Sequence, residues 1–155
     1  MKLKRCYLVL VIFFLAYCNN KPKDISIALA YNQENEFDSA LIYFEKAIKN
    51  DSSNAELHYY IGDCYFKTEN FTQSILSLLK AKELGKQSAD LFFKIGYAFI
   101  TKETYRLHYF LSAIRLDSSY QEAWYYGGLV NVEIGKWDDA YEFFTKSIEL
   151  APEHH

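Results

Sequence analysis

The sequence predicts an all-α solenoid built from four helix-turn-helix hairpins, and two observations point to this fold. Small residues recur at a nearly fixed interval, because Ala28, Gly62, Gly96 and Gly128 stand 34, 34 and 32 residues apart. Glycine and proline, which interrupt helices, number only 6 and 2 in 155 residues. Hydrophobic residues make up 50% of the chain, which is enough for a packed core. A period of about 34 residues is typical of solenoids made of paired helices.

A second series of small residues has the same period. Ala47, Ala81, Ala113 and Ser147 are spaced by 34, 32 and 34 residues. Both series therefore place a two-residue shortening between Gly96 and Ala113. Glycine inside a helix lowers helix stability by about 1 kcal/mol relative to alanine. Its recurrence is expected only where two helix backbones approach closely.

The two series divide most of the chain into four units, each a helix, a turn and an antiparallel helix. The units span residues 21–54, 55–88, 89–120 and 121–154. In the fourth unit we expect the turn at Gly135, because glycine readily adopts the left-handed conformation that ends a helix. Trp137 then begins the second helix. The third unit has a shortened turn, and Arg106 replaces a small residue there, so we expect a local distortion of that hairpin.

The fourth unit resembles the tetratricopeptide repeat over all 34 residues. Trp124, Gly128, Ala140, Phe144 and Pro152 stand where that family has an aromatic residue, a small residue, alanine, an aromatic residue and the closing proline. The resemblance implies a right-handed superhelix whose concave face is lined mainly by the first helix of each hairpin. It also implies that this face holds peptide segments of other proteins.

The same resemblance indicates which side chains point into the concave groove. These are Tyr59, Asp63, Phe66, Phe93, Tyr97, Ile100, Tyr125 and Leu129. The acidic residues expected at the rim are Glu56, Asp63, Asp90 and Glu122. Such an aromatic and aliphatic surface favours apolar anchors on a partner. Several of these rings could instead fill the gaps between neighbouring first helices, and for Tyr60 and Tyr126 we favour that packing role.

One known function of the family is not expected here. The tetratricopeptide domains that grip a C-terminal carboxylate use Lys, Asn and Arg at fixed groove positions. Four of the five corresponding residues in this chain are of other types, the set being Ile25, Leu29, Tyr60, Asp90 and Lys94. The sequence therefore argues against a receptor for such C-terminal tails.

The N-terminus has the pattern of a secretory signal. Lys2, Lys4 and Arg5 precede a run from Cys6 to Cys18 that contains no charged residue. A helix of this length spans about 20 Å, whereas the hydrocarbon core of a membrane is ~30 Å thick. A permanent transmembrane helix is therefore the weaker interpretation.

The end of this run, Leu15-Ala16-Tyr17-Cys18, resembles a bacterial lipobox. The resemblance implies that residues 1–17 are removed and that Cys18 becomes an acylated first residue, with residues 18–20 as the lipid attachment point and a short tether. It thus implies an exported lipoprotein, expected at the outer membrane and facing the periplasm. Tyr17 stands where that family has a small residue. An ordinary signal peptide, or a buried apolar start, is the alternative.

The net charge and the absence of catalytic motifs limit the functions expected of this chain. Without residues 1–17 the chain keeps 14 of its 17 basic residues and all 20 acidic ones, a net charge of −6, which argues against a nucleic-acid partner. The sequence has no phosphate-binding loop, nucleophile elbow or metal-ligand spacing, so we expect no catalytic residue, metal or cofactor. The expected function is a non-catalytic scaffold for protein partners of the cell envelope. The alternative is a receptor that stacks a glycan or another small molecule on the aromatic groove.

The last expected helix, 137–150, carries an apolar stripe. Tyr141, Phe144 and Ile148 are spaced by three and four residues, so they share one helix face. The residues after Pro152 are too few for a capping helix, which terminal repeats usually need. We therefore expect this end to be covered by a second copy of the chain, as a homodimer, or by a partner. Alternatively, the neighbouring charged residues shield the stripe in a monomer.

Overall fold

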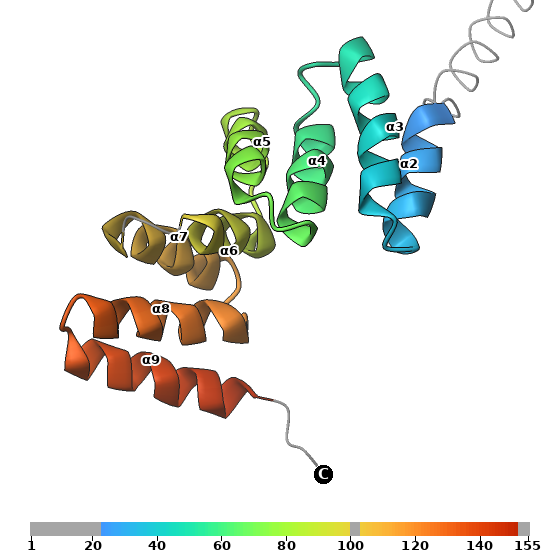
Figure 1. The fold of residues 1–155 in the computed structure, drawn as a ribbon. Helices are drawn as coiled ribbons and strands as arrows, with labels where there is room; N and C mark the ends of the chain where they lie inside the picture. The colour runs from blue at the N-terminus through green and yellow to red at the C-terminus, as the bar shows by residue number, and fades with distance from the viewer. Residues whose placement is uncertain (1–22, 100–102, 152–155) are drawn as a thin grey trace, which may run out of the picture.

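The computed structural model describes residues 23–99 and 103–151, and every regular element within these ranges is an α-helix. In chain order they are α2 (Lys23–Gln33), α3 (Phe37–Asn50), α4 (Ala55–Lys67), α5 (Phe71–Glu83), α6 (Ala89–Ala98), α7 (Glu103–Leu116), α8 (Gln121–Glu133) and α9 (Trp137–Leu150). The closest packing is within the pairs α2/α3, α4/α5, α6/α7 and α8/α9 (Figure 1). The predicted all-α solenoid of helical hairpins is confirmed.

The hairpins follow one another in space in the same order as in the sequence. Figure 1 shows them stacked from α2 at one end to α9 at the other. Helices α2 to α5 run upright in this view, whereas α8 and α9 lie across it. The stack therefore turns along its length, as in a solenoid in which each repeat contacts its neighbours.

The turns inside the first, second and fourth hairpins use the left-handed backbone conformation. Gly135 has a φ of 76°, as the sequence predicts, and Asn35 and Glu69 occupy the same place in the first two hairpins with φ of 61° and 59°. Glycine and asparagine adopt this conformation more readily than glutamate does. The helices that follow these turns begin at Phe37, Phe71 and Trp137.

The recurring glycines leave room for large side chains of the paired helix. A Cβ at Gly62 would lie 2.7 Å from the Leu78 side chain and 3.1 Å from the Leu78 backbone nitrogen. A Cβ at Gly96 would instead lie 3.0 Å from the ring of Phe110, and a Cβ at Gly128 would lie 2.7 Å from the ring of Phe144. Close approach of two helix backbones is therefore observed at Gly62, whereas phenylalanine rings fill the equivalent space in the later hairpins.

The buried apolar side chains form two clusters. One joins α2, α3 and α4 around Phe44, and the other joins α5 to α8 around Leu78 and Phe110. The border between them lies inside the second hairpin, between α4 and α5. There Leu78 packs on Gly62, and Ser74 Oγ donates a 2.9 Å hydrogen bond to the Gly62 carbonyl. A close helix crossing with small residues thus connects the two clusters.

The third hairpin differs from the others. Helix α6 has 10 residues, whereas α4 and α8 have 13 each. The Arg106 side chain, in the place of a small residue, extends to α8, where Nη1 forms a 2.9 Å ion pair with Glu133 Oε2. The side chain is only 16% exposed, and its charged end reaches a partly exposed carboxylate.

Several predictions concern residues outside the described ranges. These are the signal segment 1–17, the attachment point Cys18 with its tether, the groove residue Ile100 and the closing Pro152. Within the described residues, none of the helices has both the length and the hydropathy needed to cross a membrane.

Candidate functional site

An aromatic cluster lies where the second, third and fourth hairpins meet. Its members are Phe66, Phe71, Phe93, Tyr97 and Tyr126. Tyr97, on α6, is central, because its ring centroid lies 5.4 Å from that of Phe66 and 5.0 Å from that of Tyr126. Phe71 and Phe93 are each 5.9 Å from it. These contacts are edge-to-face or tilted, the arrangements that aromatic pairs prefer.

These five rings line an open groove of about 350 Å³, which we call the aromatic groove. Its remaining lining residues are Lys67, Glu69 and Glu122. An adjoining hollow of about 240 Å³ shares three of the rings and is bordered by Arg106. Apolar walls with a few polar groups at the edge are typical of surfaces that bind side chains or small ligands.

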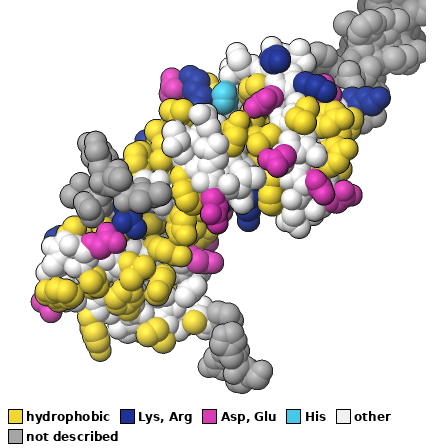
Figure 2. Space-filling view, viewed as in Figure 1, with side chains coloured by type: hydrophobic (Ala, Val, Ile, Leu, Met, Phe, Trp, Pro, Cys, Tyr) yellow, Lys and Arg dark blue, Asp and Glu magenta, His cyan; other side chains and the backbone are white. Residues whose placement is uncertain are grey.

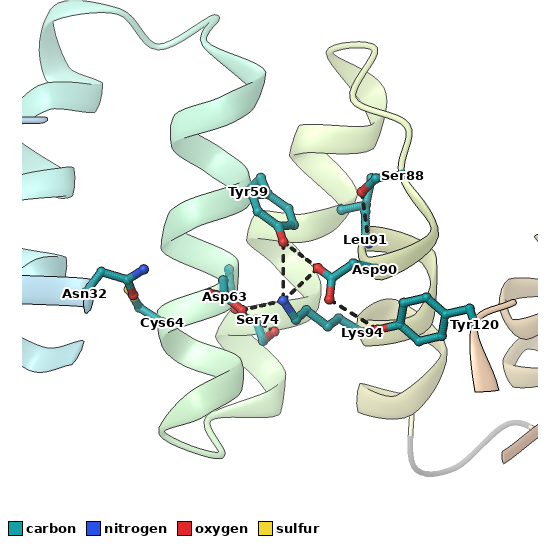
Figure 3. Close-up of polar contacts among 11 residues, drawn as sticks. Asn32, Tyr59, Asp63, Cys64, Ser74, Ser88, Asp90, Leu91, Lys94 and Tyr120 are labelled. Atoms are coloured by element: carbon teal, nitrogen blue, oxygen red, sulfur yellow. Dashed lines mark hydrogen bonds and ion pairs between the residues drawn. The ribbon is translucent and has the colours of Figure 1, made fainter. Parts of the chain in front are cut away.

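Beside the aromatic groove lies a polar cluster, which we call the Lys94 cluster: Tyr59, Asp63, Asp90, Lys94 and Tyr120. Lys94 Nζ is 2.5 Å from Asp63 Oδ1 and 2.7 Å from Asp90 Oδ2 (Figure 3). The Tyr59 hydroxyl donates to Asp90, and the Tyr120 hydroxyl donates to Asp90 Oδ1 at 3.3 Å. Only 10% of the Lys94 side chain is exposed. The largely buried ammonium is therefore held between the buried carboxylate of Asp63 and the partly exposed carboxylate of Asp90.

Helix geometry explains how the Lys94 cluster forms. Tyr59 and Asp63 are four residues apart on α4, and Asp90 and Lys94 are four apart on α6, so each pair shares a helix face. The two faces meet because α4 and α6 are in contact where the second hairpin packs on the third. Lys94 Nζ also lies 6.0 Å from the ring centroid of Phe66. The Lys94 cluster and the aromatic groove are therefore adjacent.

Protonation in the Lys94 cluster is shifted towards the protonated forms. Burial raises the pKa of both Tyr59 and Tyr120, and the nearby Asp90 carboxylate raises them further. Burial alone would lower the pKa of Lys94, but the carboxylates of Asp90 and Asp63 raise it above its ordinary value. All three groups thus hold their protons more tightly in the folded chain than in the unfolded one.

We expect the free energy of unfolding to fall as the pH rises above about 10. Unfolded tyrosine and lysine lose protons near pH 10, whereas the raised folded pKa values of Tyr59, Tyr120 and Lys94 keep theirs bound. These three groups contribute fully to the free energy of unfolding below pH 10. As the pH rises towards their folded pKa values this contribution is lost, at about 1.4 kcal/mol per pH unit for each proton that the folded chain holds and the unfolded chain has released. Urea titrations from pH 8 to 11 measure this decline. The Tyr59→Phe/Tyr120→Phe variant should show a shallower fall of the free energy of unfolding with pH. Equal slopes for the variant and wild type would contradict the assignment of this fall to the two tyrosines.

The structure places the predicted groove residues of the second and third hairpins in different surroundings. Phe66 and Tyr97 line the aromatic groove, and Phe93 lines it while also being buried in the core. Asp63 does not stand at the rim, because its carboxylate is bound to Lys94 inside the Lys94 cluster. The interior position of Asp63 corrects the rim assignment for that residue.

The other predicted rim residues and Tyr126 also differ in whether they line the aromatic groove. Asp90 belongs to the Lys94 cluster, and Glu56 pairs with Lys86 at 2.6 Å, so only Glu122 of the expected rim residues lines the aromatic groove. Tyr126, for which we favoured a packing role, both packs on other rings and lines the groove.

In the fourth hairpin, the two predicted groove residues lie apart from the aromatic groove. Tyr125 is 44% exposed, and its ring is 5.2 Å from that of Tyr126 and 5.9 Å from that of Phe144. Leu129 is half-buried on the same helix. The groove lining given for the described residues includes neither of them.

The apolar stripe predicted on α9 is partly exposed. Tyr141 and Ile148 are 76% and 74% exposed, and Trp137, on the same helix face, is 66% exposed. Phe144 instead packs inward, with its ring beside Gly128. Figure 2 shows hydrophobic side chains gathered at the end of the molecule formed by α8 and α9. We call Trp137, Tyr141 and Ile148 the α9 face.

The described residues offer little for catalysis. No three His, Cys, Asp or Glu side chains among them lie close enough to share a metal ion. Cys64 is buried, with Sγ 3.6 Å from Asn32 Oδ1, and burial raises the pKa of its thiol to about 12. A thiol that stays protonated is a poor nucleophile.

Comparison with known proteins agrees with this architecture. The model of the tetratricopeptide repeat family matches residues 26–89. A crystal structure of MamA is 29% identical in sequence and aligns with a TM-score of 0.74 over 81% of this chain and 75% of that chain. A second MamA crystal structure is 28% identical, with a TM-score of 0.75 over 82% and 70% of the two chains.

A third structure is of Desulfovibrio magneticus RS-1 MamA, from its residue 41 to its end. It shares the fold at 20% sequence identity. Its TM-score is 0.75 over 85% of this chain and 76% of that chain. The match of the repeat model and these structural likenesses lead to one conclusion. The chain has the fold of an all-α solenoid of tetratricopeptide repeats.

Proposed function

We propose that this chain is a non-catalytic scaffold that holds a segment of a partner protein in the aromatic groove. The observation that carries the proposal is the groove itself, in which five aromatic rings from three hairpins surround about 350 Å³ of open space. Aromatic side chains provide large contact areas and dominate the binding energy of many protein interfaces. Extended concave surfaces of this kind are what solenoid proteins use to bind partners.

The variant Tyr97→Leu tests this proposal, because Tyr97 contacts every other ring of the groove. Affinity capture with the full chain from its native cells should recover partners at least tenfold less well with this variant than with wild type. Tyr43→Leu is the matched control, since Tyr43 is half-buried on α3 and stacks on Tyr31. Thermal melts would check that both variants fold. Equal recovery of partners by Tyr97→Leu and wild type would argue against the groove as the binding site.

We also propose that the chain is exported and held at a membrane through Cys18, with the outer membrane and its periplasmic side as the expected address. The lipobox-like ending of the N-terminal apolar run supports this proposal. The first described helix begins at Lys23, so only a few residues separate the proposed lipid from the solenoid. The partners are then components of the cell envelope.

Cys18→Ser is expected to abolish acylation and to release the chain from membranes. Stable anchoring needs at least two acyl chains, and the thiol of Cys18 is the proposed attachment point. Labelling with a fatty-acid analogue, followed by membrane fractionation, measures both effects. Cys64→Ser is the matched control and should keep the label, because its thiol is buried. If wild type takes up no label, the lipoprotein proposal is wrong.

We propose further that the α9 face is covered by a second copy of the chain. The Ile148→Glu variant should then change a wild-type dimer into a monomer, because a carboxylate would be buried in the contact. Light scattering measures the mass directly. Ile42→Glu is a suitable control, since Ile42 is 56% exposed on α3, far along the chain from α9. A wild-type chain that is monomeric, with no partner at this end, would contradict the proposal.

A further inference from the structure

The free charge at the aromatic groove is negative. Glu69 and Glu122 line it together with one basic residue, Lys67. None of these three belongs to an ion pair among the described residues. Two unpaired carboxylates and one unpaired ammonium therefore line the groove, a net charge of −1.

The other cations near the aromatic groove are already bound. Lys94 is paired with both Asp63 and Asp90, which leaves the Lys94 cluster with a net negative charge. Arg106, beside the adjoining hollow, is paired with Glu133. Lys94 is therefore not free to hold a carboxylate of a partner, and the charge of Arg106 is balanced by Glu133, although its buried Nε has no hydrogen-bond partner.

The walls of the groove also favour a positive charge. The faces of aromatic rings carry negative electrostatic potential and attract ammonium and guanidinium groups. This chain uses that contact for its own lysines, because Lys94 Nζ lies 5.3 Å from the Tyr59 ring centroid and is paired with carboxylates. Lys86 Nζ lies 4.7 Å from the same centroid and pairs with Glu56 at 2.6 Å. An ammonium held between the Tyr59 ring and a carboxylate thus occurs twice, and among the rings that line the groove Phe66 has Lys94 Nζ 6.0 Å from its centroid.

We propose that the aromatic groove recognises a basic side chain, lysine or arginine, in the partner segment. The proposal rests on the proposed scaffold function and specifies the chemistry of the partner. The alkyl stem of the basic residue packs on the rings, and its charged end reaches Glu69 and Glu122. An acidic residue at the same place would face two carboxylates, and like charges brought together weaken binding. Charge complementarity therefore selects a basic segment.

A selection from random peptides tests the proposal. The probe is a phage-displayed library of random eight-residue peptides, selected on the immobilised full chain in detergent. We expect one position of the selected peptides to be enriched at least fivefold in lysine or arginine. The Glu69→Gln/Glu122→Gln variant should lose this enrichment while still selecting apolar residues. Glu34→Gln/Glu142→Gln is the matched control, because it removes the same charge at two exposed positions that do not line the groove.

The outcomes separate this inference from the function on which it rests. If no peptide is enriched, both the scaffold function and the basic specificity are wrong. Peptides selected without a basic position would overturn the specificity and leave the scaffold function standing. A basic preference that persists in Glu69→Gln/Glu122→Gln would also overturn it, since the attraction would then come from the net charge of the whole chain.

Affinity provides a second readout on the same variants. A selected peptide should bind wild type at least tenfold more tightly than its analogue in which norleucine replaces the basic residue. This ratio should shrink to about twofold in Glu69→Gln/Glu122→Gln and stay unchanged in Glu34→Gln/Glu142→Gln. A ratio near one in wild type would show that the basic group makes no contact in the groove.

Discussion

Replacing Lys94 with methionine is expected to lower the free energy of unfolding by roughly 3–5 kcal/mol. The ammonium holds the carboxylates of Asp63 and Asp90, and the Asp63 side chain is only 12% exposed. Methionine matches the length of the stem but leaves a buried carboxylate without its counter-charge. Urea denaturation of the full chain, followed by circular dichroism, measures the change.

Two further variants make this expectation specific to the Lys94 cluster. Lys80→Met removes an exposed lysine that pairs with Glu83 three residues away, and it should change the free energy of unfolding by less than about 0.5 kcal/mol. Adding Asp63→Asn and Asp90→Asn to Lys94→Met should recover part of the loss, because the unpaired charges are then removed. Similar losses for Lys94→Met and Lys80→Met would show that the cluster contributes nothing beyond a surface ion pair.

The second large effect is expected at the crossing of α4 and α5, where Gly62→Leu should cost roughly 3 kcal/mol. Even a Cβ at Gly62 would lie 2.7 Å from the Leu78 side chain and 3.1 Å from its backbone nitrogen. A side chain can change rotamer, but the backbone of α5 can move only with its helix. The pair must therefore separate, which also stretches the hydrogen bond from Ser74 to the Gly62 carbonyl.

Gln73→Leu is the matched control for this variant. Gln73 is exposed on α5, and glutamine and leucine have similar helix propensities. The control should therefore leave the thermal midpoint within about 2 °C of wild type, whereas Gly62→Leu should lower it by roughly 6–12 °C. Equal midpoints would mean that Gly62 is not at a tight crossing.

The solenoid could be predicted from sequence because its period reflects local geometry. A small residue is needed wherever the paired helix or one of its large side chains lies close, so Gly62, beside the α5 backbone, and Gly128, beside the Phe144 ring, mark the repeat directly. The left-handed turn at Gly135 is likewise a local requirement of the backbone. What fills the space opposite each glycine could not be predicted, because Leu78 and Phe110 come from the paired helix.

The groove was harder to predict because its lining depends on contacts between hairpins. The family pattern assigns groove positions on each first helix separately, and on that basis Asp63 stands at the rim. In the folded chain Asp63 meets Lys94 from the next hairpin and turns inward. Glu69 was missed because it lies in a turn, and Phe71 was missed because it begins a second helix. The family pattern assigns no groove residue at either place. The spacings of Tyr59 from Asp63 and of Asp90 from Lys94, four residues each, were the available signal of the Lys94 cluster.

The border between the two apolar clusters runs through the second hairpin, and this has a consequence for how the chain opens. Cooperative opening units follow buried contacts and need not coincide with sequence repeats. An N-terminal unit that opens at this border takes along α4, which shares an apolar cluster with α2 and α3, and it must break the contact of Gly62 with Leu78 and the ion pair of Asp63 with Lys94. Helix α5 is then left without its cover. The bared surface of α5 fits an α4 helix of identical sequence from another molecule. Exchange of α2 to α4 between two molecules would restore the contacts of α4 with α5 and α6, at the cost of the turn at residues 68–70 that joins α4 to α5 in the monomer, so a swapped pair becomes accessible on partial opening at high concentration.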